Sequence, residues 1–275
     1  MADAPADAAR ADNAPADAAA RADAARADAA ARADAAPADA AARPVALVTG
    51  ARRGLGRGMV EHLLAQGWRV YGCARHALDA PPTHPDHHHA IVDVSIEDEV
   101  VRWVREVARE AGRIDALVNN AGVASMNHAL LTTRATLDRV FSTNVGATFV
   151  AAREAAKYMR RRRAGRIVNL STVAVPLHLE GEAIYAASKA AVEELTRVLA
   201  RELGELGVTV NAIGPSPIRT DLIAGVPDDK IQQIVARGAL KRLGELDDVL
   251  AVLDFFLSPR AGFVTGQVVY LGGFG

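Results

Sequence analysis

Short apolar runs alternate with amphipathic segments along the chain from Pro44 onward. Runs rich in valine, isoleucine and leucine, with no polar alternation, are typical of strands buried on both faces of a parallel sheet. Seven such runs predict strands at residues 45–50, 68–75, 89–94, 114–122, 165–172, 208–215 and 266–273. Apolar positions recurring every three or four residues predict helices. These lie at residues 56–67, 97–112, 137–163 and 246–258, with a further helix starting near Tyr185.

Strands that alternate with helices predict an α/β fold, a doubly wound parallel sheet of about seven strands with helices on both faces. We expect one domain, residues 44–275. Ligands of such sheets bind beyond the carboxyl ends of the strands. The polar or turn residues predicted at those ends are Thr49, Arg75, Asp93, Asn120, Ser171 and Pro215.

Residues 1–43 have a different composition. Alanine, aspartate and arginine repeat with an 11-residue period, and arginines fall at Arg10, Arg21, Arg32 and Arg43. Alanine favours helix, but the only apolar group on offer is a methyl group, and three prolines interrupt the pattern. The segment is therefore predicted to be a disordered or partly helical extension. An assembly or targeting arm is the alternative interpretation.

Composition sets limits on the class of protein. Half of the 275 residues are hydrophobic, which allows a large core, and the formal net charge of −1 gives no reason to expect a nucleic acid or membrane partner. No apolar run is long enough to cross a bilayer. Cys73 is the only cysteine, so no internal disulfide can form. A cytoplasmic protein is predicted.

A glycine-rich turn joins the first predicted strand to the first helix. Gly50, Gly54 and Gly56 allow a tight turn and a close approach of backbone to ligand. The helix that follows points free N–H groups and the positive end of its dipole at an anion. Placed after the first strand of an α/β pattern, this loop predicts a nucleotide site.

Four motifs, in this order, resemble those of the short-chain dehydrogenase/reductase family: the glycine loop from Thr49 to Gly56, Asn119-Asn120-Ala121-Gly122, Asn144, and Tyr185 with Lys189 four residues later. The likeness is to its reductase-like branch, which includes 3-oxoacyl-acyl-carrier-protein reductases, and it covers residues 44–275. It implies a single-domain Rossmann-type fold, a nicotinamide cofactor and a homotetramer or homodimer.

The resemblance also implies which residues hold the cofactor. The loop contributes Gly50, Arg52, Arg53, Gly54, Leu55 and Gly56. Asp93 and Val94 would border the adenine, and Asn120, Ala121 and Gly122 would pack beside the adenosine ribose. Pro215, Ile218 and Thr220 follow the sixth predicted strand, and Ile218 and Thr220 would meet the nicotinamide carboxamide, although Ser216 stands where the family usually has glycine.

The choice between NADP and NAD depends on charge after the second predicted strand. A carboxylate there would bind the ribose hydroxyls of NAD and repel a 2′-phosphate. This chain has Arg75 instead, and Arg53 lies in the glycine loop. Two guanidinium groups can hold a 2′-phosphate through charge-assisted hydrogen bonds. We expect NADP, with NAD less favoured.

Tyr185 and Lys189 are four residues apart and therefore share one face of a helix. A free tyrosine has a pKa of about 10. A neighbouring ammonium and the positive nicotinamide of the oxidised cofactor are expected to lower it. Tyr185 can then exchange a proton with a carbonyl oxygen during hydride transfer. Lys189 would also bind the nicotinamide ribose.

Two residues compete for the role of the serine that polarises the substrate carbonyl in the family. The family spacing, 13 positions before the tyrosine, lands on Thr172, and a one-residue shift of the loop would bring in Ser171. Either hydroxyl can donate a hydrogen bond. Asn144 matches the asparagine that holds a proton-relay water.

Several other features are interpreted as structural. The histidines at His84, His87, His88 and His89 are expected in a solvated loop without a metal, and the family's helix in this short segment is expected to be missing. The Arg160–Arg163 run should end a helix rather than bind nucleic acid. Cys73 should pack within a strand. Residues 221–240 resemble the family's mobile substrate lid.

The main hypothesis is an NADP-dependent oxidoreductase that reduces a ketone or 3-oxoacyl thioester to a secondary alcohol. Its partner is then a small carbonyl or alcohol compound or an acyl thioester. One alternative is an NADP-binding sensor or scaffold with weak catalysis, suggested by the shifted serine and by Ser216. Another is an NAD-preferring alcohol dehydrogenase.

Overall fold

The computed structural model describes residues 43–218 and 226–274. By contacts between residues, the chain divides between Arg43 and Pro44, and the fold described below is that of the second part. Of the sequence-based predictions, the 1–42 repeat, Thr220 and the start of the expected lid lie outside the described residues. None of the described helices is long and apolar enough to span a membrane.

The described residues form one sheet of seven parallel strands in the order β3-β2-β1-β4-β5-β6-β7. The strand order reverses direction between β1 and β4, which places a crevice at the carboxyl ends of these two strands. The strands are β1 (Val45–Thr49), β2 (Arg69–Ala74), β3 (His87–Ile91), β4 (Ala116–Asn119), β5 (Gly165–Leu170), β6 (Val208–Gly214) and β7 (Val268–Tyr270). The predicted doubly wound, Rossmann-type fold is confirmed.

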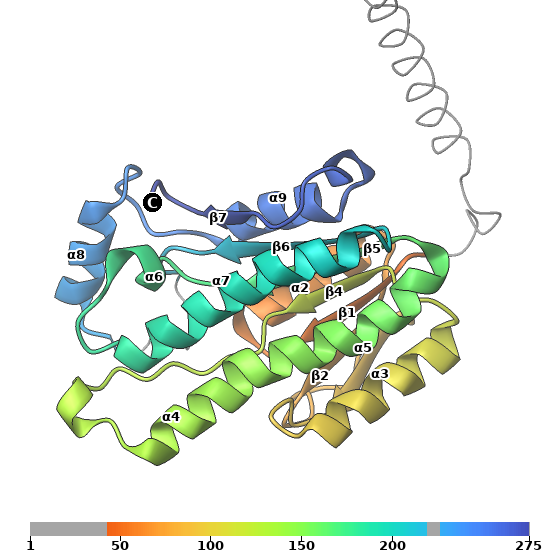
Figure 1. Cartoon of the computed structure of the whole chain (residues 1–275), viewed down its shortest axis with the longest axis horizontal. Helices are drawn as coiled ribbons and strands as arrows, with labels where there is room; N and C mark the ends of the chain where they lie inside the picture. The colour runs from red at the N-terminus through yellow and green to blue at the C-terminus, as the bar shows by residue number, and fades with distance from the viewer. Residues whose placement is uncertain (1–42, 219–225, 275) are drawn as a thin grey trace, which may run out of the picture. The chain divides into compact units, whose positions relative to one another are not determined.

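Helices cover both faces of the sheet (Figure 1). Along β1, Val45 and Leu47 pack toward α3, α5 and α7, whereas Ala46 and Val48 pack toward α2 and α9. Successive side chains of a strand point to opposite faces, so each strand contributes to two separate cores. The helices are α2 (Gly54–Ala65), α3 (Glu97–Ala111), α5 (Ala147–Arg162), α7 (Ala183–Gly204) and α9 (Leu246–Leu257).

The predicted helix over residues 137–163 is interrupted. α4 (Arg134–Phe141) and α5 are separated by a π-helical turn, Ser142–Gly146, which contains Asn144. A wider turn of this kind re-aims the side chains that follow it and is frequent at functional sites. Within it, the Asn144 side chain bonds to the backbone of Val123, outside the helix.

Smaller elements complete the described fold and were not predicted from the sequence. They are α6 (Ala174–Leu177), α8 (Asp228–Arg237) and the 3-10 turns Ala129–Leu131 and Pro259–Ala261. α8 falls within the segment expected to act as a lid. Figure 1 shows α6 and α8 at one end of the sheet, beyond the tips of the strands.

The expectation that the histidine-rich segment is a solvated loop was wrong for His87 and His88, whereas the apolar pattern already predicts His89 as the first residue of the third strand. The three histidines form most of the edge strand β3, which is paired with β2, and the His88 ring stacks on Tyr71 with centroids 4.4 Å apart. An imidazole has an apolar face, so it can take a strand position and stack on a neighbouring ring. As predicted, no helix lies between Arg75 and His87.

Candidate active site

The glycine loop between β1 and α2 is locked to the turn after β4. The Asn120 amide nitrogen Nδ2 donates to the carbonyl oxygens of Thr49, at 3.0 Å, and Gly50, at 3.2 Å. The Thr49 hydroxyl oxygen accepts from the backbone N–H groups of Asn120 and Ala121. The two predicted cofactor motifs therefore form one rigid unit at the reversal point of the sheet.

The loop has the shape of a cradle for a phosphate group. Gly50 and Gly54 have φ values of 69° and 55°, which side chains rarely allow. A Cβ atom on Gly56 would overlap the carbonyl oxygen of Gly50 and lie 2.5 Å from Nδ2 of Asn120. No side chain of the described residues caps the first turn of α2, and no acidic residue lies in that turn. The backbone N–H groups in the first turn of α2 therefore suit an anion such as a pyrophosphate.

The three predicted arginines occupy different positions. Arg52 is held by the segment that follows β2: its Nε donates to the carbonyl oxygen of Ala77 at 2.9 Å and its Nη2 to Asp79 at 2.5 Å. Arg53, in the loop, and Arg75, at the end of β2, are both exposed. Arg52 therefore shapes the loop, while Arg53 and Arg75 carry positive charge at its solvent side.

Asp93 and Val94 follow β3, as predicted. Burial alone would raise the pKa of Asp93, but hydrogen bonds from Ser95 and the positive charge of Arg75 outweigh it and lower the pKa below its ordinary value. The Asp93 carboxylate accepts from both the backbone N–H and the hydroxyl of Ser95. Asp93 is thus a fixed negative group close to Arg75.

Tyr185 and Lys189 lie on the buried face of α7, with Tyr185 only 8% exposed. Both line a pocket together with Thr172 and Ser171, at the carboxyl ends of β4, β5 and β6. Thr172 lies near enough to Tyr185 to lower its pKa slightly, and its hydroxyl oxygen accepts from the backbone N–H of Ala174 at 3.2 Å. Ser171 also lines the pocket, but its hydroxyl donates at 2.5 Å to Oε1 of the buried Glu193. The Ser171 hydroxyl is therefore engaged in the interior, whereas that of Thr172 lies beside the tyrosine.

The electrostatics of the pair differ from the sequence-based expectation. Burial, with a further contribution from the Glu182 carboxylate, raises the pKa of Tyr185 to about 12, against a smaller lowering by Thr172. Burial also lowers the pKa of Lys189 to about 8, and its Nζ donates to the carbonyl oxygen of Leu170 at 2.7 Å. Desolvation of the phenolate dominates in this structure, and the lowering of the Tyr185 pKa expected from Lys189 and the oxidised cofactor stays a prediction.

Asn144 is fully buried behind the pair. Its Oδ1 accepts from the N–H of Val123 at 2.8 Å, and its Nδ2 donates to the Val123 carbonyl and to the Ser188 hydroxyl. A Cβ atom on Gly122 would lie 3.3 Å from Asn144 Oδ1 and 3.4 Å from Lys189 Nζ. The structure therefore brings Gly122, Asn144 and Lys189 together.

The segment after β6 borders the same pocket through Pro215, Ser216 and Ile218. Ser216, the departure from the family pattern, is accommodated by Gly244, where a Cβ atom would lie only 2.6 Å from the Ser216 hydroxyl. Ile218 forms a parallel bridge with Gly244. A small residue at position 244 thus makes room for the serine, and Thr220 lies outside the described residues.

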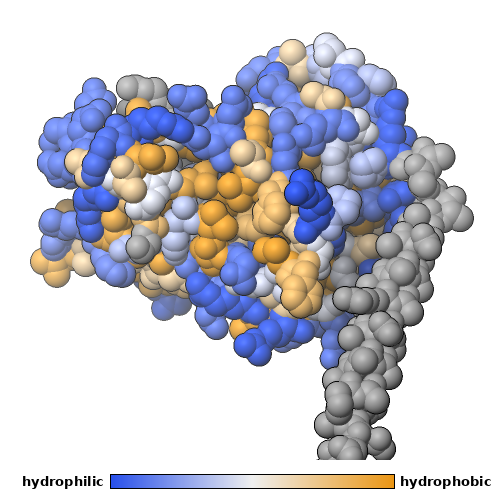
Figure 2. Space-filling model, turned by 90° about the horizontal axis from the view of Figure 1, so that it is seen from above, coloured by the Kyte–Doolittle hydropathy of each residue, from blue (hydrophilic) through white to orange (hydrophobic). Residues whose placement is uncertain are grey.

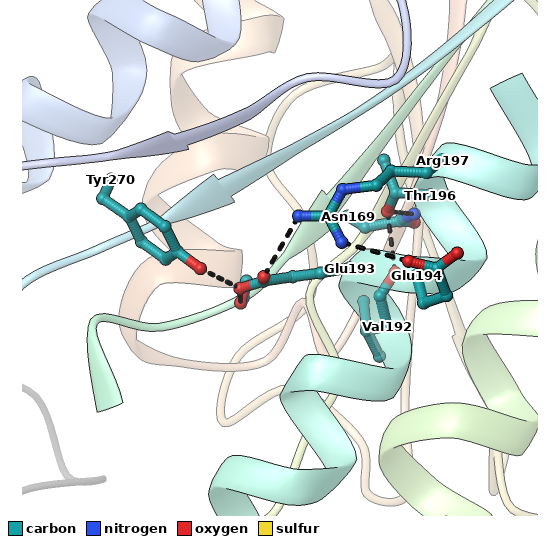
Figure 3. A network of polar contacts seen from close by, with 8 residues as sticks. Asn169, Val192, Glu193, Glu194, Thr196, Arg197 and Tyr270 are labelled. Atoms are coloured by element: carbon teal, nitrogen blue, oxygen red, sulfur yellow. Dashed lines mark hydrogen bonds and ion pairs between the residues drawn. The ribbon is translucent and has the colours of Figure 1, made fainter. Parts of the chain in front are cut away.

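Sequence reasoning missed a buried carboxylate behind the site. Glu193 is 4% exposed and receives the hydroxyls of Ser171 and Tyr270, the latter at 2.6 Å, while Arg197 lies 3.6 Å away (Figure 3). The signal was present: Glu193 lies one turn after Lys189, on the face that the motif had already assigned to the interior. Glu182, which lines the pocket, was also missed.

Comparison with known proteins agrees with this geometry. The family profile described as Enoyl-(Acyl carrier protein) reductase matches residues 50–274. A 3-oxoacyl-(acyl-carrier-protein) reductase of Staphylococcus epidermidis is 34% identical over 236 residues, which cover 83% of this chain and 97% of the relative.

Two solved structures are also similar. Levodione reductase superposes with a TM-score of 0.78 at 29% identity, covering 84% of this chain and 97% of the other. The ligand-free aldohexose dehydrogenase of Thermoplasma acidophilum gives a TM-score of 0.76 at 28% identity, covering 85% and 94%.

The fold and the site define a nicotinamide-dependent oxidoreductase that acts on CH–OH groups or the carbonyls derived from them. The chain belongs to the short-chain dehydrogenase/reductase family and resembles its 3-oxoacyl-acyl-carrier-protein reductases.

Proposed function

We propose that this protein uses NADPH to reduce a ketone or a 3-oxoacyl thioester to a secondary alcohol. The observation that carries the proposal is the convergence of Thr172, Tyr185 and Lys189 on one pocket, with Lys189 one turn after Tyr185 on α7. Two hydroxyls that line the same pocket can both bind one carbonyl oxygen. The similar proteins from S. epidermidis and the levodione reductase are named as reductases.

Different residues of the chain have different roles in this reaction. When bound, the nicotinamide supplies the hydride for the carbonyl carbon. Thr172 donates a hydrogen bond to the carbonyl oxygen and orients it. Tyr185 gives its phenolic proton to that oxygen as negative charge develops there. A high pKa keeps Tyr185 protonated at neutral pH, so the proton is present when it is needed.

Lys189 and Asn144 support that proton transfer. The Lys189 ammonium lies in the interior beside Gly122 and Asn144, where its positive charge stabilises a phenolate formed by proton loss. Because the pKa of Lys189 is about 8, most of the ammonium is charged at neutral pH. Asn144 fixes the turn of Val123 and thereby the wall of the pocket.

The preference for NADPH rests on charge at the adenosine end of the cradle. Arg75 stands at the carboxyl end of β2, where an NAD-binding chain would carry an acid, and Arg53 is exposed in the glycine loop. In an NAD-preferring alcohol dehydrogenase, the positive charges of Arg53 and Arg75 would have no 2′-phosphate to bind. A sensor with weak catalysis is disfavoured by the Thr172 contact and by the fit of Ser216 against Gly244.

Tyr185→Phe tests the reaction. The change removes only the hydroxyl, so turnover with NADPH should fall by roughly 10³-fold or more, while NADPH affinity, followed by fluorescence titration, should stay within a few-fold. Tyr158→Phe on α5, away from the pocket, is the matched control and should leave both unchanged. Full turnover by Tyr185→Phe would remove the tyrosine from the mechanism.

Self-association is part of the proposal. Hydrophobic side chains gather on the face shown in Figure 2, on the side of α9 and β7. Phe255 of α9 is 46% exposed, and β7 is an edge strand. An exposed apolar patch beside an unpaired strand edge suits a homodimer or homotetramer. Light scattering tests it, and Phe255→Glu should shift the mass toward the monomer. The prediction of a cytoplasmic protein stays a prediction.

A further inference from the structure

The substrate side of the pocket is apolar with one exception. Beyond Thr172 and Tyr185, its wall is made largely of Val173, Ala174, Leu179, Ile231 and Ile234. Among the described residues that line the pocket, the charged ones are Lys189, whose Nζ donates to Leu170, and Glu182. A carboxyl group in such a wall requires an explanation.

Glu182 has no partner among the described residues for one of its two oxygens. Oε2 is buried from solvent and makes no hydrogen bond. Glu182 stands at the N-terminal end of α7, yet its side chain does not cap the helix. Burial raises the pKa of the carboxyl group, as expected for an acid facing an apolar cavity. A buried acceptor without a hydrogen bond lowers the stability of the protein unless a bound molecule donates one.

The position of Glu182 relative to Tyr185 indicates what that partner is. Glu182 lies three positions before Tyr185 in the chain, both residues line the same pocket, and the Glu182 carboxylate is close enough to raise the pKa of Tyr185. A compound whose carbonyl oxygen binds Tyr185 and Thr172 would therefore place its neighbouring carbon atoms beside Glu182.

We propose that Glu182 is a specificity-determining residue that accepts a hydrogen bond from a hydroxyl group next to the reacting carbonyl. This inference rests on the proposed function and narrows it: the substrate is a hydroxyketone rather than a plain acyl chain. The apolar residues around Glu182 bind the rest of the molecule. A hydrocarbon in the same place leaves Oε2 without a partner, which disfavours it.

A matched pair of ketones tests the inference: 2-hydroxyacetophenone and propiophenone, which differ by a hydroxyl in place of a methyl group. Wild-type protein with NADPH should reduce the hydroxyketone with a kcat/KM at least roughly tenfold higher. Glu182→Leu should abolish that preference by raising KM for the hydroxyketone while leaving propiophenone nearly unchanged. Glu182→Gln keeps an acceptor and should retain most of the preference.

Glu180→Gln is the control, because Glu180 lies in the same loop but is exposed. It should change neither ketone. An equal loss on both ketones in Glu182→Leu and Glu182→Gln would mean that Glu182 has only a structural role and would overturn the inference. A wild-type preference for propiophenone would do the same.

Binding of the two ketones to the NADP-loaded protein, measured by calorimetry, separates this inference from the proposed reaction. Glu182-dependent binding of the hydroxyketone without turnover would keep the hydroxyl subsite and refute the reductase. Equal turnover of both ketones would keep the reductase and refute the subsite. Failure to bind either ketone would count against the subsite.

Discussion

Ser171 donates its hydroxyl hydrogen to Oε1 of Glu193 at 2.5 Å, inside the protein, while the hydroxyl of the next residue, Thr172, accepts from the backbone N–H of Ala174 at 3.2 Å and lies near Tyr185. The two neighbouring hydroxyls thus have different partners. Glu193 is also bonded by Tyr270 of β7, so the carboxylate ties the end of β5 to α7 and to the edge of the sheet (Figure 3). Ser171 is part of the support behind the candidate site, and under the proposed function Thr172 is the hydroxyl that binds the substrate carbonyl.

Removal of these two hydroxyls, one at a time, should therefore separate an effect on catalysis from an effect on stability. Thr172→Val removes a donor to the carbonyl oxygen and should lower kcat by about 10²–10³-fold, with little change in the free energy of unfolding. Ser171→Ala leaves the buried Glu193 carboxylate short of a partner and should reduce the free energy of unfolding by about 1–3 kcal/mol, with kcat changed only a few-fold. Steady-state kinetics and urea titration measure the two effects. The reverse pattern would assign the role in catalysis to Ser171.

The coenzyme preference should depend on Arg75. Arg75→Ala removes a charge-assisted contact to a 2′-phosphate, so the ratio of kcat/KM with NADPH to that with NADH should fall by roughly tenfold or more. The fall should come from KM for NADPH. Arg102→Ala, an exposed arginine on α3, should leave the ratio as it is. An unchanged ratio in Arg75→Ala would show that the Arg75 guanidinium does not bind the 2′-phosphate of NADPH.

The burial of Lys189 should appear in the pH dependence of stability. Its pKa in the folded protein is about 8, against 10.5 for an ordinary lysine. Between these values the unfolded chain binds a proton that the folded protein does not, so stability rises with pH. The full difference is about 3 kcal/mol, at roughly 1.36 kcal/mol per pKa unit.

Lys189→Met should remove this rise. Urea titrations at pH 7, 8, 9 and 10 would measure the free energy of unfolding of wild type minus that of Lys189→Met, and the difference should become more favourable to wild type as pH increases. Other titrating groups cancel in the subtraction. Lys230→Met, at an exposed position on α8, should give a difference that does not vary with pH. A flat difference for Lys189→Met would mean that the ammonium is well solvated.

The glycine cradle should tolerate no side chain at position 56. Gly56→Ala places a Cβ atom against the Gly50 carbonyl and 2.5 Å from Asn120 Nδ2, so the loop must move away from its anchor. NADPH affinity should fall by at least about tenfold, measured by fluorescence titration. Gly204→Ala, at the end of α7 with open space around it, should instead raise stability by up to about 1 kcal/mol. Tight NADPH binding by Gly56→Ala would exclude this loop as the phosphate site.

The sequence predicted the fold and the catalytic pair because both depend on local patterns. Apolar runs and glycines give the strands and the first turn, and the interval from Tyr185 to Lys189 places both on one helix face. It could not choose between Ser171 and Thr172, since the choice depends on Glu193, twenty-two residues away from Ser171. The partner of Glu193 on β7 is farther still, at seventy-seven residues.

The errors have similar physical origins. His87 and His88 were assigned to a loop because histidine is polar, but stacking of His88 on Tyr71 and pairing with β2 favour a strand. The burial that raises the pKa of Tyr185 is not visible in the sequence, whereas the number of residues to Lys189 is. The π-helical turn contains Asn144, whose bond to Val123 is a contact that helical periodicity does not encode.

The place of β7 in the sheet also bears on how the protein matures during synthesis. From β1 outward, β4, β5, β6 and β7 are added in the order in which a ribosome produces them. A chain synthesised only as far as β6 lacks Tyr270, so Glu193 then has no partner on β7. The carboxylate behind the candidate active site receives that partner only after the edge strand has been added, so β7 completes the surroundings of Glu193.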